Sequence, residues 1–188
     1  MAKFIFGLII GILILPLTAV VYVGAGLLPI GATDPPMPFE KQFAGGAVYR
    51  RIDHLAPMRE ISEFKTADYV TGADVYQKDC AFCQWLPQQE APPVSQGMFP
   101  HAPQLFTPKG TVTDDPVGVS YWKVKNGIRL TGMPSFQASL SDQQIWDVAA
   151  LVAQADKLPP GALDALKPPT PGEPSAARAT VPAAKPKR

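Results

Sequence analysis

Cys80 and Cys83 stand two residues apart in the stretch VYQKDCAFCQWLPQ, and the chain has no other cysteine. A C-x-x-C pair can do several kinds of chemistry. A disulfide across so short a loop is strained and readily reduced. A thioredoxin-like redox pair needs a strand before it, and the sequence predicts none. A zinc site needs two further ligands, and the two histidines, His54 and His101, lie far apart in sequence.

The fourth chemistry open to this pair is covalent attachment of haem, whose signature is C-x-x-C-H. The chain has Gln84 where that signature has its histidine. A glutamine side chain offers iron a neutral amide oxygen, which is a hard donor, or an amide nitrogen without an available lone pair. Gln84 is therefore a poor axial ligand. The motif predicts either an altered haem site or a domain that has kept the fold and lost the haem.

A methionine and a histidine further along the chain are the other candidate donors. Met133 lies in RLTGMPSF, where Gly132 allows a close backbone approach and Pro134 stiffens the loop. A thioether is a soft, neutral ligand that raises the reduction potential of a haem relative to a second imidazole. His101 lies in the proline-rich loop MFPHAPQLF. It is either an exposed loop residue or, after a loop rearrangement, a substitute imidazole ligand.

Three predicted helices position these residues, and no segment alternates like a strand, so the fold class is all-α with long loops. The first helix places five residues on one continuous face. The second begins with Asp115 as its cap and Pro116 at its first position. The third begins with a capping box of Ser141 and Gln144 and ends before Pro159. The five residues of the first face are Tyr69, Ala73, Tyr76, Cys80 and Cys83.

The order of these pieces from residue 66 to residue 159 resembles the single-haem class I cytochromes c. The matching motifs are GADVYQKDCAFC, PQL, YWKVKNGIRLTGMPSF and LSDQQIWDVAALVAQADKLP. The chain is most similar to the membrane-anchored, proline-tailed cytochromes c of bacterial periplasms. The resemblance implies that Cys80 and Cys83 hold a haem c through thioethers and that Met133 is the distal iron ligand. It also implies that the Pro103 carbonyl orients a proximal histidine, which is replaced here by Gln84.

Residues 4–30 carry no charge and are long enough to cross a bilayer of about 30 Å. A cleaved signal peptide usually has a shorter apolar core, so we predict an uncleaved transmembrane anchor over residues 1–30. Lys3 places the amino terminus in the cytoplasm and the remaining chain in the periplasm, at the inner membrane. We predict a linker with a short amphipathic helix over 31–65, the cytochrome-c-like domain over 66–159, and a disordered Pro/Ala-rich tail over 160–188.

The function that these patterns predict is one-electron transfer between membrane complexes of a respiratory chain. The partners are then the membrane and redox proteins, with no small-molecule substrate and no enzyme activity. A net charge of +1 argues against nucleic-acid binding. Two alternatives stay open. One is a haem-free structural subunit with the same fold, and the other is a Cu(I) site, because two thiolates, a thioether and an imidazole are soft ligands.

Overall fold

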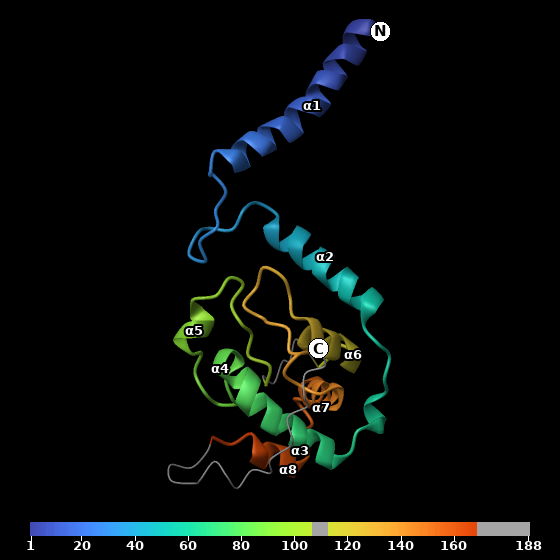
Figure 1. The fold of residues 1–188 in the computed structure, drawn as a ribbon, viewed down its shortest axis with the longest axis vertical. Helices are drawn as coiled ribbons and strands as arrows, with labels where there is room; N and C mark the ends of the chain where they lie inside the picture. The colour runs from blue at the N-terminus through green and yellow to red at the C-terminus, as the bar shows by residue number, and fades with distance from the viewer. Residues whose placement is uncertain (107–112, 169–188) are drawn as a thin grey trace. The chain divides into compact units, whose positions relative to one another are not determined.

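The computed structural model describes residues 1–106 and 113–168, which form helices joined by long loops, with no strand among them. The chain forms two compact units, one over Met1–Glu40 and one from Lys41 onward (Figure 1). The all-α prediction is confirmed for the part of the chain that is described.

The first unit contains the long apolar helix α1, Ala2–Gly24. Its segment Lys3–Gly24 is 22 residues long, has a mean hydropathy of 2.8 and is exposed along its whole length. At about 1.5 Å per residue it is long enough to cross a bilayer. Pro16 lies inside it, and the Thr18 hydroxyl donates to the Leu15 carbonyl at 2.9 Å in the same turn. The helix fits a single-pass membrane anchor.

The second unit begins with the helix that the sequence placed in the linker. This helix, α2, spans Glu40–Leu55. Its Ile52 is only 1% exposed, so one face of α2 is packed. A 3-10 turn, η1 (Ile61–Glu63), follows before the domain's next helix. Residues 41–65 of the segment predicted as a linker therefore belong to the second compact unit, in which Ile52 is covered.

The predicted first helix of the domain is divided into three pieces. The helix α3 covers Thr66–Val75, a π-helical turn, η2, covers Tyr76–Cys80, and a short helix, α4, covers Ala81–Gln84. A π turn inserts an extra residue into the helical period. The predicted continuous face is therefore broken just before the C-x-x-C pair. A further short helix, α5 (Pro93–Gln96), lies in the loop that follows.

The helix α6 spans Val117–Asn126 and its start differs from the prediction. Pro116, not Asp115, is the N-cap residue, and no side chain caps this end. The Asp115 carboxylate instead forms an ion pair with the Lys123 ammonium group at 3.1 Å. The prediction of Asp115 as the cap was wrong. The helix begins one residue later than predicted, and the Asp115 carboxylate pairs with Lys123.

The last predicted helix is α7, Asp142–Ala153, and its capping box is present. The Ser141 hydroxyl accepts from the Gln144 N–H at 3.2 Å, and the Gln144 side chain accepts from the Ser141 N–H at 2.9 Å. The helices α3 and α7 pack on each other. At the crossing, a Cβ added to Gly72 would lie 2.3 Å from the Asp147 carbonyl oxygen, so the two backbones touch.

The chain continues into a helix where the sequence predicted disorder. This helix, α8, spans Pro160–Ala165 and packs against α3. Ala162 and Leu166 are buried, at 0% and 2% exposure. The prediction of a disordered tail was therefore wrong for residues 160–168, because two apolar side chains in an Ala/Pro-rich segment suffice to dock one helical turn. Residues 169–188 of that predicted tail lie outside the described residues.

Candidate functional site

The two cysteines lie at the junction of η2 and α4. Cys80 is the N-cap residue of α4 and Cys83 lies inside it. Both are free thiols and partly buried, and Cys80 packs against the hydrophobic core. Burial, together with the nearby Asp79 and Cys83, raises the pKa of the Cys80 thiol to about 12. A thiol that stays protonated at neutral pH is a poor nucleophile, which argues against a thioredoxin-like dithiol.

A buried tyrosine holds the end of the helix that carries these cysteines. The Tyr76 hydroxyl shares its one proton between the backbone carbonyls of Gln84, at 2.8 Å, and Trp85, at 3.1 Å. Burial, and the neighbouring Cys80, raise the pKa of Tyr76, so the phenol remains a donor. Its ring packs edge-on against Phe106, with centroids 4.8 Å apart. The bonds satisfy carbonyls that a helix end leaves open. The sequence placed Tyr76 only on one face of the first helix and did not predict these hydrogen bonds.

Gln84 is the last residue of α4 and is partly buried. Its position at the helix end is held through its backbone carbonyl by Tyr76, independently of its side chain. Trp85 then turns the chain away with a φ of 30°, a conformation that side-chain-bearing residues rarely adopt. The amide side chain thus occupies the histidine position of the C-x-x-C-H signature without being needed to hold the backbone there.

Met133 lies in a loop closed by backbone hydrogen bonds. Its carbonyl accepts from the Ile128 N–H at 3.1 Å, and its own N–H donates to the Thr131 hydroxyl at 3.1 Å. At Gly127, φ is 68°, and an added Cβ would lie 2.7 Å from the Pro134 carbonyl carbon. Met133 itself is partly buried and packs against the core. The loop geometry therefore fixes this thioether at the edge of the domain core.

A second methionine lies beside this loop and was missed by the sequence reasoning. A Cβ added to Gly132 would lie 2.5 Å from the sulfur of Met98. The glycine does permit a close approach, as the sequence indicated, and in this structure the approaching group is the Met98 thioether. The contact joins the proline-rich loop to the Met133 loop. Position 132 tolerates no side chain while Met98 occupies this place.

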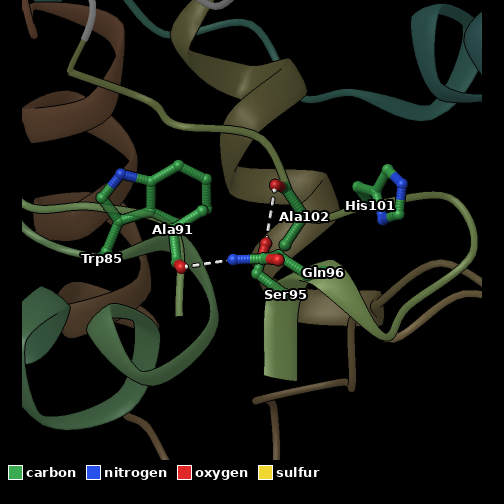
Figure 2. A pocket seen from close by; sticks show the side chains of 6 residues that line it. All are labelled: Trp85, Ala91, Ser95, Gln96, His101 and Ala102. Atoms are coloured by element: carbon green, nitrogen blue, oxygen red, sulfur yellow. Dashed lines mark hydrogen bonds between the residues drawn. The ribbon is translucent and has the colours of Figure 1, made fainter. Parts of the chain in front are cut away.

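The remaining predicted site residues, Pro103 and His101, are both exposed. His101 lines an open pocket of about 420 Å³ that also contains Trp85. Figure 2 shows the two rings on opposite sides of Ser95 and Gln96. The Ser95 hydroxyl donates to the Ala102 carbonyl at 3.2 Å, and the Gln96 amide donates to the Ala91 carbonyl at 2.9 Å. His101 and Trp85, the residue after Gln84, thus line one pocket from opposite sides. Cys80, Cys83 and Met133 do not line this pocket.

Residues 1–106 and 113–168 contain no place where three or more His, Cys, Asp or Glu side chains converge as metal ligands. His101 and the two cysteines are thus not gathered into one donor set. The geometry gives no support to the zinc site or to the copper site that uses the imidazole. His54, the other histidine, is exposed on α2.

The helical fold, the C-x-x-C helix end and the methionine loop resemble those of a cytochrome c-type domain. Residues 67–152 match the family model described as cytochrome C oxidase, cbb3-type, subunit III. The match begins in α3 and ends in α7, so it includes every candidate donor. Comparison with curated proteins found no match, and comparison with solved structures found none either.

A cytochrome c-type domain implies a bound haem c, and the residues of this chain fit that group in part. Two thiols are available for thioether bonds, and the Met133 loop presents a soft neutral donor next to the core. The position of the usual imidazole carries the amide of Gln84. The donor set thus fits covalent attachment and one axial bond, and it does not fit a His–Met axial pair.

Proposed function

We propose that this protein is a membrane-anchored, periplasmic one-electron carrier. The observation that carries the proposal is that Cys80, Cys83 and Met133 all fall inside the segment that matches the cytochrome family model. When bound, the haem supplies reversible one-electron chemistry. The partners are then redox proteins or membrane complexes, with no small-molecule substrate and no catalysed reaction.

In this proposal the chain's own residues hold and tune the group. Cys80 and Cys83 retain it covalently from the end of α4, where Tyr76 fixes the backbone. Met133 would supply a thioether ligand to the iron. Position 84 offers no imidazole, so His101 would supply one only after a rearrangement of its loop. Pro103 keeps its place on that loop, but the histidine that its carbonyl would orient is replaced by Gln84.

A haem-free structural subunit is the second candidate, and one observation favours it. The end of α4 is held by the Tyr76 hydroxyl and by core packing, which involve only protein groups. The domain therefore has a means of holding its C-x-x-C helix that does not depend on an iron–histidine bond. In this alternative, the fold serves as an interaction surface in a membrane complex.

The experiment that separates the candidates is Gln84→His, expressed with a cytochrome c maturation system. The new imidazole restores the attachment signature, so we expect a covalent, low-spin haem with the introduced histidine and Met133 as its axial pair. The unaltered protein should instead hold a high-spin centre or no covalent haem, because an amide cannot supply the ligand field of an imidazole. A visible spectrum, a pyridine haemochrome assay and the intact mass report these states.

Two further variants make the outcome interpretable. If His101 already serves as the substitute ligand, the unaltered protein is low-spin and His101→Ala abolishes that signal. A double change of both cysteines to alanine in the Gln84→His background should remove covalent attachment. If Gln84→His is folded by circular dichroism and still acquires no haem, the electron-carrier proposal is wrong and the haem-free subunit replaces it.

The anchored location is tested separately on the unaltered protein. We expect the mature chain to keep residues 4–30 and to remain with membranes after a high-salt or carbonate wash. A mature amino terminus beyond residue 20, or release into the soluble fraction, would contradict the anchor and leave the haem assays unaffected.

A further inference from the structure

One side of α2 is packed against the protein, and the opposite side therefore faces solvent. Ile52 is buried at 1% exposure, and the Lys123 ammonium group of α6 lies 5.5 Å from the centre of the Tyr49 ring. Val48, one turn before Ile52, is partly buried. The side of α2 that carries Ile52 therefore faces the rest of the second unit.

The opposite side of α2 presents aromatic and basic residues to solvent. Phe43 precedes Ile52 by nine residues, which is two and a half helical turns, so it points the opposite way. It is 77% exposed. Arg50 and His54 share this side by the same spacing, and both are exposed. Arg51 and Asp53, on either side of Ile52 in sequence, flank this side and are exposed too. The exposed side thus combines one phenylalanine with more basic than acidic groups, which favours contact with an anionic lipid surface.

The position of α2 in the chain indicates which surface it meets. Only the residues 25–39 separate the end of α1 at Gly24 from the start of α2 at Glu40. At most ~3.4 Å per residue, they allow roughly 50 Å of reach. If α1 spans the bilayer, a lipid surface is thus always within reach of α2. Met37 and Phe39, just before α2, are exposed as well, which extends the apolar character toward the anchor.

We propose that the exposed side of α2, formed by Phe43, Arg50, Arg51 and His54, binds the lipid surface of the membrane that α1 anchors. Phe43 enters the boundary between headgroups and acyl chains. Arg50 and Arg51 pair with anionic phosphate groups, their aliphatic stems lying along the apolar layer. This inference rests on the anchor in the proposed function and is independent of haem. It makes α2 a second membrane contact that keeps the domain at the surface.

The test places a photo-reactive benzoylphenylalanine at single positions of the full chain in lipid nanodiscs of phosphatidylcholine and phosphatidylglycerol. Position 43 reports the proposed contact. Position 12 in α1 is the positive control. Position 163 is the matched negative control, because Leu163 is an exposed apolar residue on another helix, α8, at 48% exposure. Lipid adducts are counted by mass spectrometry after irradiation.

We expect lipid adducts at position 43 to exceed those at position 163 severalfold. Arg50→Gln with Arg51→Gln, or nanodiscs of phosphatidylcholine alone, should reduce the adducts at 43 at least twofold and leave those at 12 unchanged. Labelling at 12 with background labelling at 43, or cross-links from 43 to a second copy of the chain, would overturn the inference and leave the anchor intact. Background labelling at 12 as well would overturn the anchor and, with it, this inference.

Discussion

The crossing of α3 and α7 and the loops that carry the candidate donors are built in opposite ways. At the crossing, the backbone of Gly72 touches the backbone of Asp147, and α7 contributes fully buried alanines. The donor loops instead leave His101 and Pro103 exposed and Met133 half-buried. Dense packing resists substitution, whereas exposed positions tolerate it. The stability of this domain therefore depends on residues other than His101 and Pro103, the exposed candidates for its chemistry.

The largest expected effect is at the crossing. Gly72→Ala places a methyl group 2.3 Å from the Asp147 carbonyl oxygen, so the two helices must separate. Overpacking of this kind costs typically about 1–3 kcal/mol, occasionally more. Urea unfolding in detergent, followed by circular dichroism, measures the loss.

The matched control for this change is Gly45→Ala in α2, where an added Cβ meets nothing within 4 Å. Removing a helix-interior glycine there should stabilise the chain by about 0.5–1 kcal/mol. Equal effects of the two substitutions would mean that the backbone contact at the crossing is not the reason for the difference.

The second largest effect, also at the crossing, is a dependence of the folding stability on pH through Asp147. Burial raises the pKa of the Asp147 carboxyl to about 6, and the nearby Asp68 carboxylate adds to this rise. The Gln143 amide, which donates to Asp147 at 2.7 Å, and the Arg59 guanidinium group lower the pKa in part. The unfolded value is about 3.9. The folded state thus binds this proton more tightly, and the stability contribution is full below about pH 4 and is lost as pH rises through about 6.

Asp147→Asn keeps an acceptor for Gln143 and removes the charge. We therefore expect the melting temperature of Asp147→Asn to exceed that of the unaltered protein at pH 7 and the difference to shrink as pH falls toward about 4. Circular dichroism melts across this range provide the measurement. A difference that does not change with pH would show that the carboxyl is ionised in the folded protein throughout.

A smaller effect is expected at the start of α7. Ser141→Ala removes the hydroxyl that accepts from the Gln144 N–H and should cost about 1 kcal/mol. Ser141→Asp, which keeps an acceptor at the cap, should retain most of the stability. Equal losses in the two variants would indicate that the cap hydrogen bond does not contribute. Urea unfolding distinguishes these results.

The smallest effect belongs to the donor loops. His101 is exposed, so His101→Ala should change the free energy of unfolding by less than about 0.5 kcal/mol. Any effect on a haem spectrum would then come from lost ligation and not from lost folding. A large loss of stability at this exposed position would contradict the separation of fold and chemistry described above.

The sequence by itself determined the features that depend on local period and composition. The apolar run predicted α1, and the Ser141–Gln144 spacing predicted the start of α7 and its capping box. Apolar residues recur at helical spacing in α7, and these residues, Ile145, Val148, Ala149 and Val152, are all buried. Hydrophobic periodicity and capping act within a few residues, so a single chain displays them without tertiary context.

Only the tertiary structure decided the features that depend on distant partners. Asp115 met Lys123 and did not cap α6, and two buried side chains docked α8 in a segment whose composition indicates disorder. The π turn before Cys80 accompanies the Tyr76 hydroxyl's bonds across eight and nine residues. The Met98 thioether, on a separate loop, packs against Gly132. Each of these features depends on a contact between residues that are not neighbours in the local helical period. A local sequence pattern does not show which distant residues will meet.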